Sequence, residues 1–238
     1  MLAAQRQPQS SATRLRMRIR LAVRLLALCF VAIAAGAVRA QPVSQGEVPL
    51  AELLEVLLVD RDLVAISARR GGQVSERLLL DESVLWLGAR GKVGVAVTTR
   101  RILAVAAGSG SWQETTYLKG ERPPLAPQLG DRVALVHTDR RALGVDGGSG
   151  NLVEYRLGPK ERLLASEVGA NVAVFATERS ALGLSPLKGG FFPVKLSAAE
   201  RIESITTAAN LATLSTNRRV LIFRTPTGTW EERTRDLN

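Results

Sequence analysis

Apolar runs and turn-forming residues alternate along most of this chain in a fixed order. Short runs rich in Val, Leu and Ala, such as "RVALVHT" at 132–138 and "NLVEYRL" at 151–157, are separated by turns rich in Gly, Pro and charged residues. Apolar runs joined by such short turns predict β-strands that pair with their antiparallel neighbours. No repeating unit of this region combines a helical period with helix caps. The pattern therefore predicts an all-β domain.

The pattern repeats with a period of about 39 residues. A doubled arginine, complete or partly replaced, marks each of five units, and its second position falls at 62, 101, 141, 180 and 219. Four units carry a threonine three residues before this position. A glutamate follows it by twenty residues at four places, which are Glu82, Glu121, Glu161 and Glu200. Agreement over several columns indicates a protein built from short supersecondary repeats.

Units of this length with four short strands each resemble the blades of β-propellers. The resemblance covers residues 47–238 and is one of architecture, because the Trp-Asp and Gly-His marks of the commonest propeller repeat and the kelch marks are absent. It implies one five-bladed propeller domain over residues 41–238. The implied repeats are 54–91, 92–131, 132–170, 171–209 and 210–238.

The last repeat ends after its third predicted strand. When the repeat register is projected backwards, residues 47–53, "EVPLAEL", occupy the position of a fourth strand. We therefore expect this N-terminal strand to complete the last blade and close the ring, which would remove two open sheet edges. An open β-solenoid or a β-sandwich is the alternative arrangement.

Residues 1–40 have a different character. Arginines precede the uncharged apolar run "LLALCFVAIAAGA", and small residues follow it, which is typical of a secretory signal peptide cleaved after Ala40 or after Ala37. The run is short for a membrane span of about 20 residues. A basic helix that rests on a membrane surface is the alternative. Leu28 precedes Cys29 where a lipoprotein signal needs a small residue. We expect a bacterial protein exported to the periplasm or the medium, monomeric when mature.

Removal of this segment changes the charge of the protein. The whole chain has 32 Lys and Arg and 22 Asp and Glu, a net charge of +10, but seven of the arginines lie in residues 1–40. The rest has a net charge of +3, which does not indicate nucleic-acid binding. Residues 41–238 contain no cysteine, and His137 is the only histidine. We therefore predict no metal site and no cofactor, and interpret His137 as a strand residue.

Residues that recur in every unit are expected to serve the fold, because one active site does not need five copies. We predict that Arg101, Arg141 and Arg219 pair with the glutamate column at an exposed rim and fix the turns, each pair contributing about 0–1 kcal/mol. Trp112 and Trp230 begin the third strands of their units. Such rings fill space between blades, or stack on sugars at a rim.

One column of turn residues is a candidate ligand site. Lys92, Arg132, Asn171 and Asn210 occupy matching positions in four units, so we expect them to form an arc around one opening of the ring. Two cations and two amides make a surface rich in hydrogen-bond donors. Its positive potential would attract an acidic group on a ligand or partner.

These features favour an exported, non-enzymatic binding or protein-interaction scaffold with a protein or polysaccharide partner. A carbohydrate-binding module, similar in blade number to five-bladed lectins, is the second hypothesis. A glycoside hydrolase needs two carboxylates across the scissile bond. Asp131 and Glu52 are the candidates for that role, although they would lie two blades apart.

Overall fold

The computed structural model describes residues 53–68, 71–124 and 126–235 of the chain. They lie within one compact unit, residues 48–238. The described residues form 19 strands in five antiparallel sheets, without a helix. The predicted all-β class is therefore confirmed. The predicted signal peptide and residues 47–52 lie outside the described ranges.

The sheets follow the chain in order. The first contains β1 (Leu54–Val59), β2 (Asp62–Ser67) and β3 (Gln73–Arg77), and the second contains β4 (Val84–Arg90), β5 (Val93–Thr98), β6 (Arg101–Ala106) and β7 (Gln113–Thr116). The third contains β8 (Gln128–Leu129), β9 (Val133–His137), β10 (Arg141–Asp146) and β11 (Leu152–Arg156). The fourth contains β12 (Leu163–Val168), β13 (Ala173–Thr177), β14 (Ser180–Ser185) and β15 (Gly190–Lys195), and the fifth contains β16 (Ile202–Thr207), β17 (Leu211–Thr216), β18 (Arg219–Arg224) and β19 (Thr229–Thr234).

The sheets group these strands one step out of phase with the predicted repeats. Strand β12 ends the predicted repeat 132–170, but it pairs with β13 of the next repeat, with Val168 opposite Ala173. Strands β4, β8 and β16 are grouped in the same way. Each four-stranded sheet thus takes its first strand from the end of one predicted repeat and three strands from the next. The tight turn after this first strand makes the hairpin, whereas the loop before it connects two sheets.

This grouping of the strands corrects the prediction that the last sheet lacks a fourth strand. Because β16 belongs to it, the last sheet has four strands of its own and needs none from residues 47–53. The sheet with three described strands is the first one. Leu53, the only described residue of that segment, lies in the core of the first sheet, where its carbonyl accepts a hydrogen bond from the Ala68 N–H at 3.0 Å.

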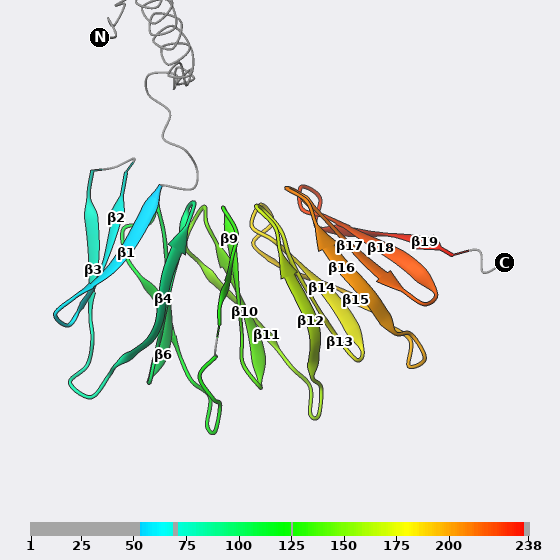
Figure 1. Cartoon of the computed structure of the whole chain (residues 1–238), viewed down its shortest axis with the longest axis horizontal. Helices are drawn as coiled ribbons and strands as arrows, with labels where there is room; N and C mark the ends of the chain where they lie inside the picture. The colour runs from blue at the N-terminus through cyan, green and yellow to red at the C-terminus, as the bar shows by residue number, and fades with distance from the viewer. Residues whose placement is uncertain (1–52, 69–70, 125, 236–238) are drawn as a thin grey trace, which may run out of the picture. The chain divides into compact units, whose positions relative to one another are not determined.

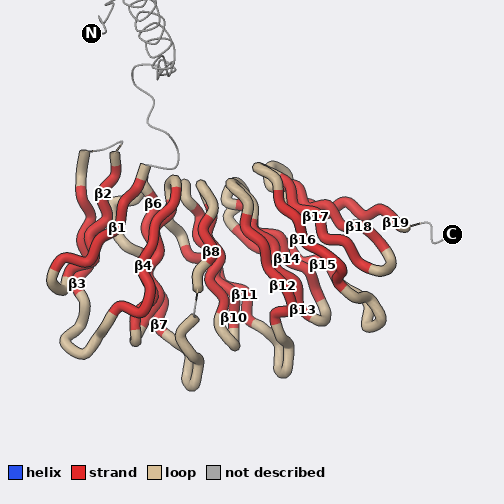
Figure 2. The backbone as a smooth tube through the Cα atoms, in the orientation of Figure 1, coloured by secondary structure: helices blue, strands red, loops and turns tan. Residues whose placement is uncertain are grey.

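Consecutive sheets stack face to face in a row (Figure 1). The main contacts between sheets join neighbours in the chain, such as β1 with β4, β5 with β9, β9 with β13 and β12 with β16. The first and last sheets stand at opposite ends of the row, and the connecting loops gather along its two long edges (Figure 2). Repeated four-stranded antiparallel sheets in this arrangement are propeller-like, and within the described residues the row is open.

The core lies between the sheets. Strands β5 and β6 are buried along their whole length because both faces of their sheet are covered. Gly183 shows how closely the sheets approach: a Cβ atom added to it would lie 2.4 Å from the ring of Phe223 in the next sheet. Where one sheet presents a large ring, its neighbour therefore presents a residue without a side chain.

Candidate functional site

The repeated arginines and glutamates form buried ion pairs where two sheets meet. In three sheets the arginine Nε donates to the glutamate in the loop that enters the same sheet: Arg101 to Glu82 at 2.9 Å, Arg141 to Glu121 at 2.9 Å and Arg219 to Glu200 at 2.8 Å. The predicted pairing is confirmed, but the predicted exposure is wrong. The side chains of Arg141 and Glu121 are 2% and 0% exposed, because the neighbouring sheet covers them.

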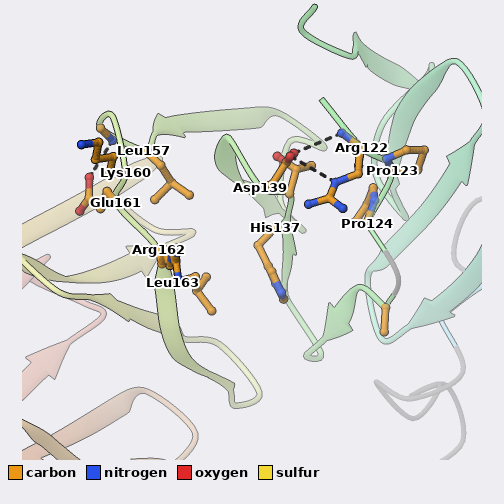
Figure 3. A pocket seen from close by; sticks show the side chains of 13 residues that line it. Arg122, Pro123, Pro124, His137, Asp139, Leu157, Lys160, Glu161, Arg162 and Leu163 are labelled. Carbon is orange, nitrogen blue, oxygen red and sulfur yellow. Dashed lines mark hydrogen bonds and ion pairs between the residues drawn. The ribbon is translucent and has the colours of Figure 1, made fainter. Parts of the chain in front are cut away.

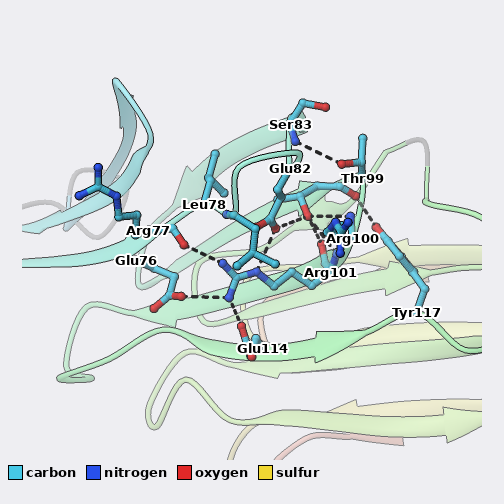
Figure 4. Close-up of polar contacts among 12 residues, drawn as sticks. Glu76, Arg77, Leu78, Glu82, Ser83, Thr99, Arg100, Arg101, Glu114 and Tyr117 are labelled. Carbon is cyan, nitrogen blue, oxygen red and sulfur yellow. Dashed lines mark hydrogen bonds and ion pairs between the residues drawn. The ribbon is translucent and has the colours of Figure 1, made fainter.

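Each of these arginines also binds the preceding sheet. Arg141 Nη2 donates to the carbonyl of Thr116 at 2.6 Å, and Nη1 donates to Thr115 Oγ1 at 3.1 Å, both on β7. Within its own sheet, Nη1 reaches Glu154 at 2.8 Å. Arg101 makes the corresponding contacts with Arg77, Glu76 and Glu114 (Figure 4). One guanidinium thus joins two sheets and the loop between them.

The glutamates use both carboxylate oxygens. Glu200 Oε1 accepts from Thr216 Oγ1 at 2.9 Å as well as from Arg219, and Oε2 accepts from the Ser197 N–H at 3.1 Å. Burial alone would raise the pKa of Glu200, but the hydrogen bonds from Arg219, Ser197 and Thr216 outweigh it and lower the pKa to about 2. Glu200 therefore stays ionised, and both of its carboxylate oxygens are engaged within the protein.

The fourth sheet lacks this arginine. Ser180 replaces it, and Glu161 accepts hydrogen bonds only from Thr177 Oγ1 at 2.5 Å and the Gly158 N–H at 2.7 Å among the described residues. Tyr155 of the preceding sheet packs edge-to-face on Phe175, with ring centroids 5.8 Å apart. Burial raises the pKa of Tyr155. Aromatic packing thus takes the place of the ion pair at this junction.

The predicted arc of turn residues lies on successive sheets. The backbone N–H groups of Lys92, Arg132 and Asn171 donate to carbonyls in the turn of the next sheet, those of Asp131 at 2.7 Å, Ala170 at 2.8 Å and Ala209 at 2.9 Å. Asn171 Nδ2 donates to Asn210 Oδ1 at 2.8 Å. Beside the arc, Asp131 pairs with Arg90 Nε at 3.0 Å.

The tryptophans lie between sheets. Trp112 is 7% exposed, and its indole N–H donates to the carbonyl of Val74 in the preceding sheet at 3.3 Å. Trp230 repeats the contact with Phe192 at 2.8 Å and packs against Phe223 with centroids 5.1 Å apart. The interpretation as packing residues therefore agrees with their positions, whereas Trp112 presents no open ring face to a sugar.

Of the two carboxylates considered for a hydrolase, the structure describes only Asp131. Asp131 is held by Arg90, and Glu52 lies outside the described ranges. The described part also contains no group of three or more His, Cys, Asp or Glu side chains placed to hold a metal ion. None of its elements is a helix long and apolar enough to cross a membrane.

Sequence reasoning missed a cavity of about 880 Å³ between the third and fourth sheets (Figure 3). Three parts of the chain line it: Arg122, Pro123, Pro124 and Ala126 before β8, the turn at 137–139, and the loop before β12 together with Leu163, its first residue. The signal in the sequence was the run "RPPLAP" at 122–127, which occupies the position of a first strand. Because proline has no N–H to donate to a ladder, β8 contains only two residues.

No family model and no curated protein matches this chain. Among solved structures, HIRA(644-1017) is 10% identical with a TM-score of 0.36, over 76% of this chain and 56% of that chain. The computationally designed Ika8 protein is 13% identical with a TM-score of 0.35, over 76% and 57%. Apo AztD from Citrobacter koseri is 13% identical with a TM-score of 0.36, over 77% and 60%. This chain thus spans less than two thirds of the length of these proteins, and they assign it to no family.

Proposed function

We propose that this protein is an exported, non-enzymatic scaffold that presents one edge of a rigid β-sheet array to an acidic partner. One observation carries the proposal. The polar residues that recur in the sequence are used in buried junctions between sheets, so they hold the array together rather than act on a substrate.

The proposal includes cleavage after Ala40, which intact-mass analysis of the exported protein would detect as a mature chain beginning at Gln41.

The partner is expected to bind the turns that carry Lys92 and Arg132. Their backbones are fixed by hydrogen bonds to the next sheet, so the edge holds both residues in defined positions. Positive side chains held on such an edge attract anionic groups, and salt screens this attraction.

Poly-L-glutamate and an array of neutral glycans distinguish the two binding hypotheses. We expect poly-L-glutamate to bind in a salt-sensitive manner, and the variant Lys92→Ala/Arg132→Ala to bind it several-fold more weakly. Arg140→Ala/Arg179→Ala is the matched control, since it removes the same charge from turns at the opposite ends of the strands. Equal binding by both double variants would contradict the proposed edge, and binding to neutral glycans alone would favour the lectin hypothesis.

We further propose that the five sheets close into a five-bladed propeller by contact between the first and last sheets. At two junctions the arginine bonds to the same position in the last strand of the preceding sheet. Arg101 bonds to Glu76 on β3 at 2.9 Å, and Arg141 bonds to Thr115 on β7 at 3.1 Å. In the first sheet Asp62 replaces the arginine, and in the last sheet Arg233 occupies the position of Glu76. The positions of the acidic and basic residues are therefore exchanged. At a junction between the last and first sheets, Arg233 would face Asp62, and the two charges would again be opposite.

Cysteines at 62 and 233 test this closure. In a Cys29→Ser chain, Asp62→Cys/Arg233→Cys should be joined by a short bismaleimide within one molecule, which mass spectrometry detects as one added linker on a monomer. Asp62→Cys/Arg156→Cys is the control, because Arg156 is exposed on the third sheet. Cross-linked dimers without cross-linked monomers, or equal reaction of both variants, would refute closure.

A further inference from the structure

The cavity between the third and fourth sheets arises from the sequence of one connecting segment. The first strands of the second, fourth and fifth sheets contain seven, six and six residues, whereas β8 contains two. Pro123, Pro124 and Pro127 precede β8 and cannot donate to β9. The chain therefore leaves the sheet before β8, and the space that a full first strand would fill becomes part of the cavity.

The lining combines apolar walls with unpaired cations. Pro124, Leu157 and Leu163 supply apolar surface. Lys160 and Arg162 enter from the loop before β12, and both side chains are exposed and without a hydrogen bond or ion pair in the described part of the chain. Figure 3 shows this loop on one side of the cavity and the segment with Pro124 on the other.

The acidic groups of the lining are already engaged. Asp139 accepts from the backbone N–H of Arg122 at 3.2 Å and pairs with its side chain at 3.4 Å. Glu161 accepts from Thr177 and from the Gly158 N–H. The charged side chains of the lining that are left to contact a ligand are therefore the cations Lys160 and Arg162.

His137 adds a polar group on the inner side. It lies on β9 between the two lining segments (Figure 3), and its Nδ1 atom is buried without a hydrogen-bond partner among the described residues. Burial lowers its pKa. A buried polar atom without a partner is costly and uncommon in folded proteins, so a ligand that supplies one would gain affinity from that bond.

We propose that this cavity binds a small carboxylate that also carries an apolar group. Lys160 and Arg162 contact the carboxylate, the proline and leucine side chains pack on the apolar part, and His137 forms a hydrogen bond with the ligand. A cavity of about 880 Å³ lies within the range of roughly 300–1,000 Å³ that small-molecule sites occupy. This inference concerns a different surface from the edge at Lys92 and does not depend on ring closure.

The only histidine of the chain makes the test direct. The full chain, purified without a histidine tag, gives a single imidazole Hε1–Cε1 signal, which is followed while 3-phenylpropionate is added. We expect a saturable shift of this signal and a higher apparent pKa of His137 in the complex, because a nearby negative charge favours the protonated ring. Arg162→Gln should raise the Kd by about tenfold, as expected for loss of one charge-assisted hydrogen bond.

Three comparisons decide the result. Arg201→Gln is the matched control, because Arg201 occupies the same repeat position before β16, away from the cavity, and its Kd should equal that of the wild type. The neutral 3-phenylpropionamide should not bind. Equal binding of the amide, no response of His137, or equal loss of affinity in both arginine variants would each overturn the proposal. Binding of tri-glutamate peptide but not of 3-phenylpropionate would also overturn it, since the carboxylate would then come from a protein partner.

Discussion

Arg141→Met is expected to lower the midpoint of thermal unfolding by about 6–20 °C. The substitution leaves the carboxylate of Glu121 buried without its cation, which in other proteins costs about 3–5 kcal/mol. For a domain of this size, each kcal/mol corresponds to roughly 2–4 °C. The substitution also removes the hydrogen bonds to Thr115 and Thr116, which join the third sheet to the second. Circular dichroism at neutral pH measures the midpoint.

Two variants separate this effect from a general sensitivity to substitution. Arg140→Met changes the exposed neighbour of Arg141 and should alter the free energy of unfolding by less than about 0.5 kcal/mol. Adding Glu121→Gln to Arg141→Met removes the unpaired charge and should restore part of the lost stability. Equal melting of Arg140→Met and Arg141→Met would contradict the buried pair.

Gly183→Ala is expected to destabilise the protein by about 1–3 kcal/mol, the usual cost of overpacking a core. The added methyl group would lie 2.4 Å from the ring of Phe223, and that ring is held by Phe192 and Trp230. Movement of the ring away from the added methyl group would disturb these two aromatic contacts. Urea unfolding followed by tryptophan fluorescence measures the change.

Gly190→Ala is the control for this substitution. Gly190 lies in the same sheet, and no atom lies within 4 Å of an added Cβ. Its replacement should leave stability unchanged or increase it slightly, because alanine restricts the unfolded chain. If both glycine variants unfolded alike, the close approach of Gly183 and Phe223 would be refuted.

The spacing of the strands could be predicted from the sequence, but their grouping into sheets could not. The period fixes how far Arg101 lies from Arg141, whichever strand begins a sheet. Both the turn after Val168 and the loop at Gly158 are short enough to join paired strands. Which of these two connections joins paired strands depends on the backbone hydrogen bonds between the strands. The sequence pattern is the same for both groupings.

The pairing of Arg141 with Glu121 could likewise be predicted, but its burial could not. Charged residues next to turns are usually solvated, and nothing local shows that a neighbouring sheet covers them. Pro123 and Pro124 look locally like ordinary turn residues, so composition alone does not predict the cavity. In repeat register they stand where a strand is expected, and that comparison would have revealed the gap.

The replacement of arginine by Ser180 has a mechanical consequence. In an array where each sheet contacts only its neighbours, cooperativity is limited by the weakest interface. The junction between the third and fourth sheets lacks the guanidinium and also contains the cavity. Under tension applied across this junction, the sheets are therefore expected to separate first between β11 and β12. This third junction would thus act as a mechanical fuse, which opens while the three sheets before it and the two sheets after it keep their own packing.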